Sequence, residues 1–166
     1  MLSNQEVAEA LLEKFGDQVF DFEEPYGLLT LSTTREQIIP ILEFLRDHKT
    51  YQVIFLTDLT GIHYPDNQDK EFVVVYHMHS FVHNFRIRIK VALAEQDIHI
   101  PTATGLFAGA NWMERETYDY FGILFDGHPN LRRILNIEEM DYFPMRKEFP
   151  LEDATREDKI DALFGR

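Results

Sequence analysis

The strongest constraint on the fold of this chain is a strict alternation of apolar and polar residues between Asn84 and Ala94. Successive side chains of a β-strand point to opposite faces of the sheet, so a period of two predicts a strand with two unlike faces. One face is apolar and the other basic: Phe85, Ile87, Ile89, Val91 and Leu93 against Arg86, Arg88 and Lys90. The chain therefore builds a sheet with one face in a core and the other in water or against acidic groups.

The remaining segments predict an α+β domain around this strand. Further strands are expected at 19–23, 28–31, 52–59 and 72–79, with Pro25-Tyr26-Gly27 turning the first two into a hairpin. Three helices are predicted: one capped by Ser3 and Glu6 and ended by Gly16, one starting at Thr33 or Thr34, and one over 104–121 ended by Gly122. Pro40 lies inside the second helical pattern and predicts a late start or a kink. This order favours a mixed or antiparallel sheet with helices packed on one side, in a single domain over 1–166.

Composition excludes several classes of protein. The chain has 166 residues and no cysteine, which removes disulfides, thiolate nucleophiles and cysteine-ligated clusters. Its net charge of −13 disfavours binding to nucleic acid or to anionic lipid, and suits a basic protein partner or simple solubility. No stretch approaches the roughly 20 apolar residues of a membrane span, and the first residues lack the pattern of a signal peptide. We expect a cytosolic or cytosol-facing protein without direct membrane insertion.

The densest group of charged residues lies between positions 114 and 133. Its predicted helical part holds three carboxylates, Glu114, Glu116 and Asp119, and three arginines, Arg115, Arg132 and Arg133, are close to them in sequence. Paired carboxylates can serve as general acid and base. Here the arginines are close enough in sequence to neutralise all three, and a carboxylate paired with arginine keeps a low pKa. A structural salt-bridge network is therefore favoured over catalysis.

Histidines offer two weaker candidates. Alternation places His77 and His79 on one face of a strand, with His83 shortly after, and a metal could bind the pair. No further ligand has a recognisable spacing, so exposed or hydrogen-bonded histidines are favoured. His128, between Gly127 and Pro129, could relay protons, but a histidine in such a turn more often bonds to the backbone.

Several motifs resemble one family. Residues 114–123 read ERETYDYFGI, residues 127–135 read GHPNLRRIL, and residues 144–150 read PMRKEFP. Together with Asn111-Trp112 and Asp58-Leu59-Thr60-Gly61, they are similar to the thirty-kilodalton subunit, or C subunit, of respiratory complex I (NADH:quinone oxidoreductase), over roughly residues 30–150. The chain departs from the family in a few places: Asn130 and Glu148 where Asp is usual, Met145 where Leu is usual, and Gly61-Ile62-His63 for Ala-Val-Asp. The last departure puts in doubt any role for an acid at position 63.

The resemblance implies a structural subunit of the peripheral arm, on the cytoplasmic side of the cell membrane. It implies no cofactor in this chain, with FMN, iron–sulfur clusters and quinone held by partner subunits. The D subunit of complex I is the foremost expected partner, followed by the B and I subunits. No catalytic or metal-binding residue is expected. The residues then expected to shape the fold or an interface are Glu114, Arg115, Glu116, Asp119, Phe121, Gly122, Gly127, His128, Pro129, Arg132, Arg133, Arg146 and Lys147.

Two points stay open at this level. The segment 141–166 has little periodicity and an acidic end, so we expect it to be a tail that is ordered by lying on a partner. The same motifs would also suit the equivalent subunit of a membrane-bound hydrogenase or formate hydrogenlyase. A more remote interpretation is a free-standing metal-dependent hydrolase that uses Glu116, Asp119 and the histidines.

Overall fold

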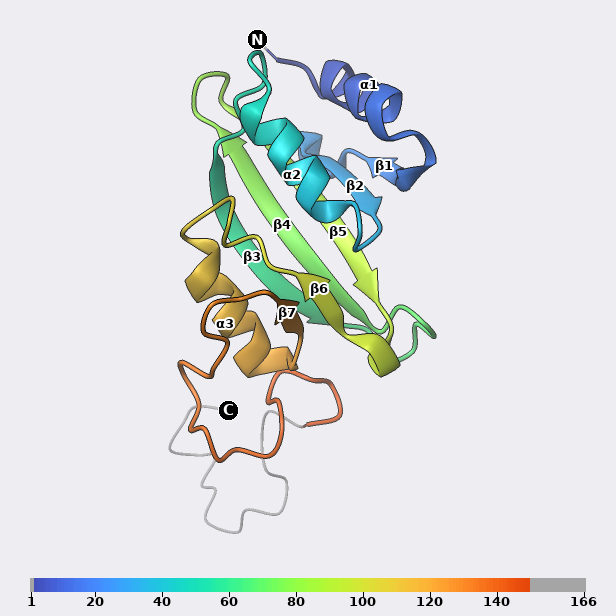
Figure 1. Ribbon diagram of the computed structural model, residues 1–166. Helices are drawn as coiled ribbons and strands as arrows, with labels where there is room; N and C mark the ends of the chain where they lie inside the picture. The colour runs from blue at the N-terminus through green and yellow to red at the C-terminus, as the bar shows by residue number, and fades with distance from the viewer. Residues whose placement is uncertain (1, 150–166) are drawn as a thin grey trace, which may run out of the picture.

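The computed structural model describes residues 2–149 and confirms the α+β class. A five-stranded sheet in the order β1-β2-β5-β4-β3 is joined by a two-stranded sheet, β6-β7 (Figure 1). The strands are Val19–Glu23 (β1), Leu29–Thr33 (β2), Phe55–His63 (β3), Phe72–Ser80 (β4), Phe85–Leu93 (β5), His99–Pro101 (β6) and Leu124–Asp126 (β7). The helices are Asn4–Phe15 (α1), Ile38–Asp47 (α2) and Ala110–Phe121 (α3), with short 3-10 turns at Gly16–Gln18, Pro25–Gly27 and Glu95–Asp97.

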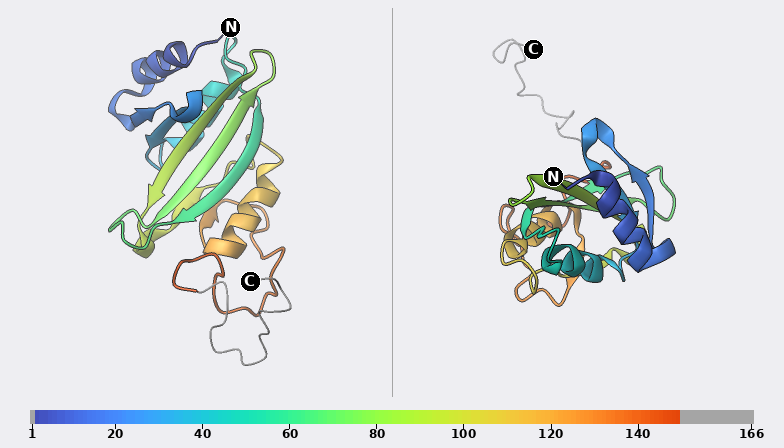
Figure 2. Two further views of the ribbon diagram at one scale, coloured as in Figure 1. Left: turned by 180° about the vertical axis from the view of Figure 1, so that it is seen from behind. Right: turned by 90° about the horizontal axis from the view of Figure 1, so that it is seen from above.

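The main sheet is mixed. β1 pairs with β2, and β4 pairs with both β3 and β5, in antiparallel register, whereas β2 runs parallel to β5. The alternation in β5 is confirmed: its apolar residues are at most 5% exposed and belong to the core. α2 and α3 lie on that side of the sheet, and within residues 2–149 no helix covers the opposite face (Figure 2).

The first helix and the hairpin agree with the sequence prediction. Ser3 caps α1, accepting from the Glu6 backbone while the Glu6 carboxylate accepts from the Ser3 backbone. Gly16 ends the helix with a positive φ of 54°. β1 and β2 form the predicted hairpin, with a bulge between Phe20 and Glu23.

The second helix begins later than the start at Thr33 or Thr34 that the sequence predicted. Thr33 still belongs to β2, and α2 begins at Ile38, so Pro40 falls in its first turn. At this position the missing N–H of proline is not needed by the helix, and no kink is required. Of the two outcomes that Pro40 allowed, the late start is confirmed.

The third helix and the 52–59 strand differ from the prediction in their bounds. α3 starts at Ala110 rather than Thr104, because Gly105 and Gly109 weaken a helix and Thr102 and Thr104 bond to nearby groups instead. β3 is shifted towards the C-terminus, since the residues before Phe55 complete the connection from α2. The short strands β6 and β7 escape prediction, because three residues are too few to show a period. Within residues 2–149 no helix is long and apolar enough to cross a membrane.

Candidate functional site

The residues that the family resemblance singles out are called here the signature residues. Among them, Asp119, Gly122, Arg133 and Arg146 gather where α3 ends. Residues 127–149, called here the return segment, have few regular elements and fold back over the C-terminal turn of α3 and the end of β3 (Figure 1). A segment without its own secondary structure has to satisfy its backbone groups through other contacts. Side chains of α3 and of the return segment itself supply those contacts.

Asp119 holds the return segment most extensively. Its buried carboxylate accepts five hydrogen bonds, from the backbone N–H groups of Ile134, Leu135 and Asn136, the Asn136 amide and the Arg133 guanidinium, at 2.7–3.0 Å. Burial by itself raises the pKa of Asp119. The donors outweigh it and hold the pKa well below its usual range. The carboxylate is therefore a fixed negative charge enclosed by its own chain.

Arg133 supplies the positive charge that pairs with Asp119. Its Nη1 lies 2.9 Å from Asp119 Oδ1, and its guanidinium also donates to the carbonyl oxygens of Asp119, Met140 and Tyr142. The Arg133 and Asp119 side chains are 6% and 0% exposed. Arginine suits the position because its planar fork of donors can serve a carboxylate and several carbonyls at once.

The prediction that arginines neutralise all three carboxylates holds for Asp119 and is wrong for the other two. Arg115 donates to the carbonyls of Arg132 and Arg133 and stacks over Trp112, while Arg132 donates to Asn130. Glu116 is exposed on α3 and has no salt bridge within residues 2–149. The arginines act mainly on backbone carbonyls, which proximity in sequence could not reveal.

Gly122 allows the return segment to lie close to the helix end. Its φ of 77° is in the left-handed region, and a Cβ there would lie 2.6 Å from the Phe143 ring and 2.8 Å from Arg146 Nη2. Arg146 Nε donates to the Phe121 carbonyl at 2.8 Å, which satisfies one acceptor at the helix terminus. The Phe143 ring is within 4.9 Å of both the Arg133 and the Arg146 guanidinium. Glycine at 122 is thus required by both conformation and space.

His63 fastens the far part of the return segment. This buried side chain, at the end of β3, stacks on Phe72 with ring centroids 4.5 Å apart. Its Nδ1 accepts a hydrogen bond from the backbone N–H of Lys147 at 2.9 Å and lies 3.4 Å from the Glu148 carboxylate. The sequence pointed to position 63 only as a departure from the family pattern, so this contact was missed.

Glu114 occupies a different, closed environment on α3. It is 0% exposed, and its carboxylate accepts from the Thr102 hydroxyl at 2.5 Å and the Ala103 backbone N–H at 2.6 Å. His128 Nε2 is 4.0 Å away and is also fully buried. Burial raises the pKa of Glu114 to about 7, against the two hydrogen bonds that lower it. The low pKa that the sequence predicted for this carboxylate is wrong, because no arginine reaches it.

The raised pKa gives Glu114 a distinct effect on stability. Between about pH 4.5 and pH 7 the folded chain keeps a proton on Glu114 that the unfolded chain releases. The stability contributed by that proton is present below about pH 4.5 and is lost as the pH rises through about 7. Glutamine cannot ionise, so the stability of Glu114→Gln does not depend on this proton. Between pH 4.5 and pH 8 the free energy of unfolding of Glu114→Gln should therefore rise by about 3 kcal/mol relative to that of the natural chain.

Urea unfolding at several pH values measures this difference. Glu116→Gln is the matched control, because it makes the same change at a more accessible position of the same helix. Its stability should follow that of the natural chain across the range. A Glu114→Gln curve parallel to that of the natural chain would contradict the assignment.

The histidine candidates are occupied by local contacts. His128 accepts from the Asn130 N–H at Nδ1 and lies 3.1 Å from the Asn111 carbonyl at Nε2, as expected of a histidine that fixes a turn. His77 lies between Asp58 and Arg88 on β4, and His79 faces Asn84. In the part of the chain that the structure describes, no group of three or more metal-ligating side chains is arranged to hold an ion.

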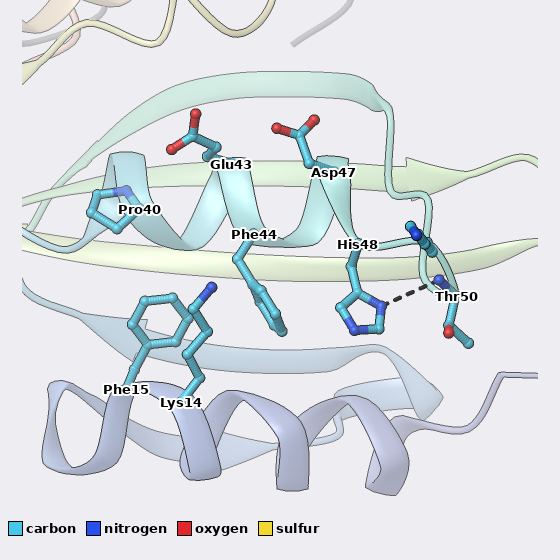
Figure 3. Close-up of a pocket in the computed structure, with 9 residues that line it drawn as sticks. Lys14, Phe15, Pro40, Glu43, Phe44, Asp47, His48 and Thr50 are labelled. Atoms are coloured by element: carbon cyan, nitrogen blue, oxygen red, sulfur yellow. Dashed lines mark hydrogen bonds between the residues drawn. The ribbon is translucent and has the colours of Figure 1, made fainter.

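A groove between α1 and α2 has no signature residue in it. Its volume is about 680 Å³, and Phe15 and Phe44 meet edge to face across it (Figure 3). The Lys14 ammonium lies 4.1 Å from the Phe44 ring centroid and covers part of the apolar surface. Acidic and basic side chains are mixed along the rim, and none converge on one point. The groove therefore does not compete with the α3 region as a candidate site.

The residues that sequence reasoning missed are mostly neutral. Thr102, Ala103, Asn136 and Phe143 contact the signature residues through a hydroxyl, backbone groups, an amide and a ring. Only Phe143 offered a signal, since it is an aromatic residue next to the Pro144–Pro150 motif. The predicted residues Gly127, Pro129 and Lys147 lie in the return segment and are exposed there.

Comparisons with known proteins agree on one family. A profile described as "Respiratory-chain NADH dehydrogenase, 30 Kd subunit" matches residues 31–155. The chain is 46% identical over 146 residues to the C 1 subunit of the NADH-quinone oxidoreductase of Rhizobium meliloti, covering 88% of this chain and 72% of that protein. It is 42% identical over 157 residues to the C subunit of the NADH-quinone oxidoreductase of Citrifermentans bemidjiense, covering 95% of this chain and 96% of that protein.

Two solved structures are similar in fold. A trypsin-resistant fragment of Nqo5 superposes with a TM-score of 0.62 at 33% identity, covering 75% of this chain and 98% of the fragment. A chain of a membrane-bound sulfane sulfur reductase, an archaeal respiratory membrane complex, superposes with a TM-score of 0.74, covering 89% of this chain and 85% of that chain. At 20% identity the second likeness concerns the fold alone.

Proposed function

Because this chain belongs to the family of the 30 kDa subunit of respiratory-chain NADH dehydrogenase, we propose that it is a non-catalytic subunit of a proton-translocating NADH:quinone oxidoreductase. Its role is structural: it supports the quinone-reducing module of the peripheral arm. Electron transfer from NADH to quinone takes place on cofactors of neighbouring subunits.

The observation that carries this proposal is the state of Asp119. A catalytic carboxylate has to reach substrate or a reacting proton, whereas this one is 0% exposed and accepts five hydrogen bonds from its own chain. Arg133 and Arg146 are likewise directed at carbonyls of α3 and the return segment. The signature residues thus hold a surface segment in one conformation, which is what a subunit that orients its neighbours requires.

The proposal extends to cofactors, partners and location. FMN, iron–sulfur clusters and quinone would reside in partner subunits, with the D subunit as the foremost contact and the B and I subunits nearby. The chain would lie peripherally on the cytoplasmic side of the cell membrane. The net charge of −13 supports attachment through protein partners, because it disfavours direct contact with anionic lipid.

Purification of the native assembly through an affinity tag on this chain tests the function. We expect flavin-binding and NADH-oxidising subunits to co-purify in fixed ratio, with NADH:quinone activity in the assembly. Recovery of a nickel-binding large subunit instead would favour the equivalent subunit of a membrane-bound hydrogenase or formate hydrogenlyase. Recovery of the chain alone, with activity of its own, would reject both.

The predicted partner-binding tail falls partly outside the described residues. Residues 141–149 belong to the return segment and contact α3, whereas residues 150–166 lie beyond the described part. Removing residues 150–166 should leave the unfolding midpoint of the chain nearly unchanged and lower its incorporation into the assembly. Parallel thermal unfolding and native gel analysis measure the two effects. Full incorporation of the truncated chain would count against a partner-binding role for this tail.

A further inference from the structure

Exposed apolar side chains gather at the end of the main sheet where β3 begins and β4 turns into β5. Ile54 is 52% exposed, Phe55 44%, Phe81 59% and Val82 63%. The Phe55 and Phe81 rings have centroids 5.0 Å apart, and His79 approaches Phe81 at 4.8 Å. Single exposed apolar residues are common, but adjoining ones with aromatic rings in contact mark interaction surfaces.

Arginine lies beside these rings. The strand register pairs Phe55 with His79 and His79 with Arg86, so the three side chains form one row across the uncovered face of the sheet. Arg86 is exposed and forms no salt bridge within residues 2–149. Aromatic residues and arginine are the side chains most enriched where binding energy concentrates in protein interfaces.

A hollow adjoins the row on the other side of Arg86. It has a volume of about 540 Å³ and is lined in part by Tyr26, Leu28, His83 and Arg86. Tyr26 has a positive φ of 55° and its side chain is fully exposed. The left-handed conformation is unfavourable for a residue other than glycine. The hairpin therefore holds this ring outward, beside the arginine, at some cost in stability.

The charge of this region differs from that of the whole chain. The chain has 29 acidic against 16 basic residues. None of the residues that line the hollow or form the apolar row is Asp or Glu, and two histidines accompany the arginine. A partner that brings a carboxylate would meet the Arg86 guanidinium here with no carboxylate among the residues that line the surface, which favours both association rate and specificity.

We propose that this region, called the Phe81 surface (Tyr26, Ile54, Phe55, His79, Phe81, Val82, His83 and Arg86), binds a segment of a neighbouring subunit that combines apolar side chains with a carboxylate. The apolar groups pack on Phe55 and Phe81, and the carboxylate pairs with Arg86. The inference rests on the proposed function, since it takes the chain to be one subunit of an assembly. In Figure 1 the β4–β5 turn lies at the opposite end of the sheet from the return segment, so the contact is a separate one.

Site-specific photo-cross-linking in the native assembly tests the contact. Phe81 is replaced by benzoylphenylalanine, the tagged assembly is purified and irradiated, and adducts are mapped by mass spectrometry. Leu12, an exposed apolar residue of α1 outside the surface, carries the same probe as a control. We expect position 81 to link to a peptide of another subunit that contains Asp or Glu beside apolar residues.

Other outcomes of this experiment overturn the inference. They are an adduct with lipid, an adduct with a second copy of the chain, a linked peptide without a carboxylate, or no adduct at position 81 above that of the control. If the chain is not recovered in the assembly at all, the proposed function fails and the inference falls with it. Recovery in the assembly without the adduct rejects the inference alone.

Charge reversal provides a second, independent measurement. Arg86→Glu should lower the apparent affinity of the chain for the rest of the assembly by roughly tenfold, as expected for loss of an interface arginine. Lys70→Glu makes the same change at an exposed position of the β3–β4 loop and should leave the affinity unchanged. Arg86→Lys, which keeps the charge, should fall between them. Equal affinity of the Arg86→Glu and Lys70→Glu chains would refute the role of Arg86.

Discussion

Asp119→Ala is expected to lower the free energy of unfolding by about 3–5 kcal/mol, the range for removing one partner of a buried ion pair. The change leaves the Arg133 guanidinium buried without its carboxylate. It also leaves the backbone N–H groups of Ile134, Leu135 and Asn136 without their acceptor. Chemical denaturation monitored by the fluorescence of Trp112, which stacks with Arg115 nearby on α3, measures the loss.

Glu116→Ala is the matched control for this change. It removes a carboxylate from the same helix at a more accessible position, and substitutions away from buried networks usually alter stability by less than about 0.5 kcal/mol. Similar losses in the two variants would show that Asp119 is not the residue that holds the return segment. An assembly defect should accompany the stability loss of Asp119→Ala, because the segment that it orders would no longer keep one conformation.

The low pKa of Asp119 adds a dependence on pH. Its folded-state pKa lies below the value in the unfolded chain, so the stability it contributes is present above the unfolded pKa of about 4 and is lost as the pH falls through the folded value. The difference between the natural chain and Asp119→Ala should therefore shrink on acidification. Glu114 acts in the opposite sense, since its pKa is raised to about 7.

Gly122→Ala is expected to lower the free energy of unfolding by about 3 kcal/mol, from two causes that simple controls can separate. A left-handed residue other than glycine costs about 1–2 kcal/mol, and forcing an extra methyl into a packed site adds about 1–3 kcal/mol. Here the new Cβ would lie 2.6 Å from the Phe143 ring. Phe143 and Arg146 would have to move away from the helix end, and the return segment with them.

Two further glycines separate these causes. Gly27 has a φ of 77°, the value found at Gly122, with no atom within 4 Å of the position that a Cβ would take, so Gly27→Ala reports the conformational cost alone. Gly109 has a φ of −64° and open space around it, so Gly109→Ala should have neither cost. Thermal and urea unfolding of the three variants should rank them with Gly122→Ala least stable. If Gly122→Ala were no less stable than Gly27→Ala, close packing at the helix end would not be what requires glycine.

Features that depend on residues close together in the chain could be predicted from the sequence. The capping box at Ser3 and Glu6, the alternation in β5 and the left-handed end of α3 at Gly122 depend on neighbours a few residues apart, and the structure confirms them. The early start predicted for α3 and the missing β6–β7 pair reflect the opposite case. There the outcome depends on a distant strand and on bonds of Thr102 and Ala103 to Glu114, which no local period encodes.

The cluster of carboxylates and arginines between Glu114 and Arg133 shows most clearly what the sequence determines and what the tertiary structure decides. The sequence by itself determined that the cluster exists, that it resembles one family, and that its charges roughly balance. Only the tertiary structure decided that Asp119 pairs with Arg133 and has a lowered pKa. It also decided that Glu114, on the same helix, accepts a hydrogen bond from Thr102 and has a raised pKa. The physical reason is that a pKa and an ion pair depend on burial and on donors within about 3 Å. Those donors come from backbone groups far along the chain, whose positions are set only when the return segment folds over α3.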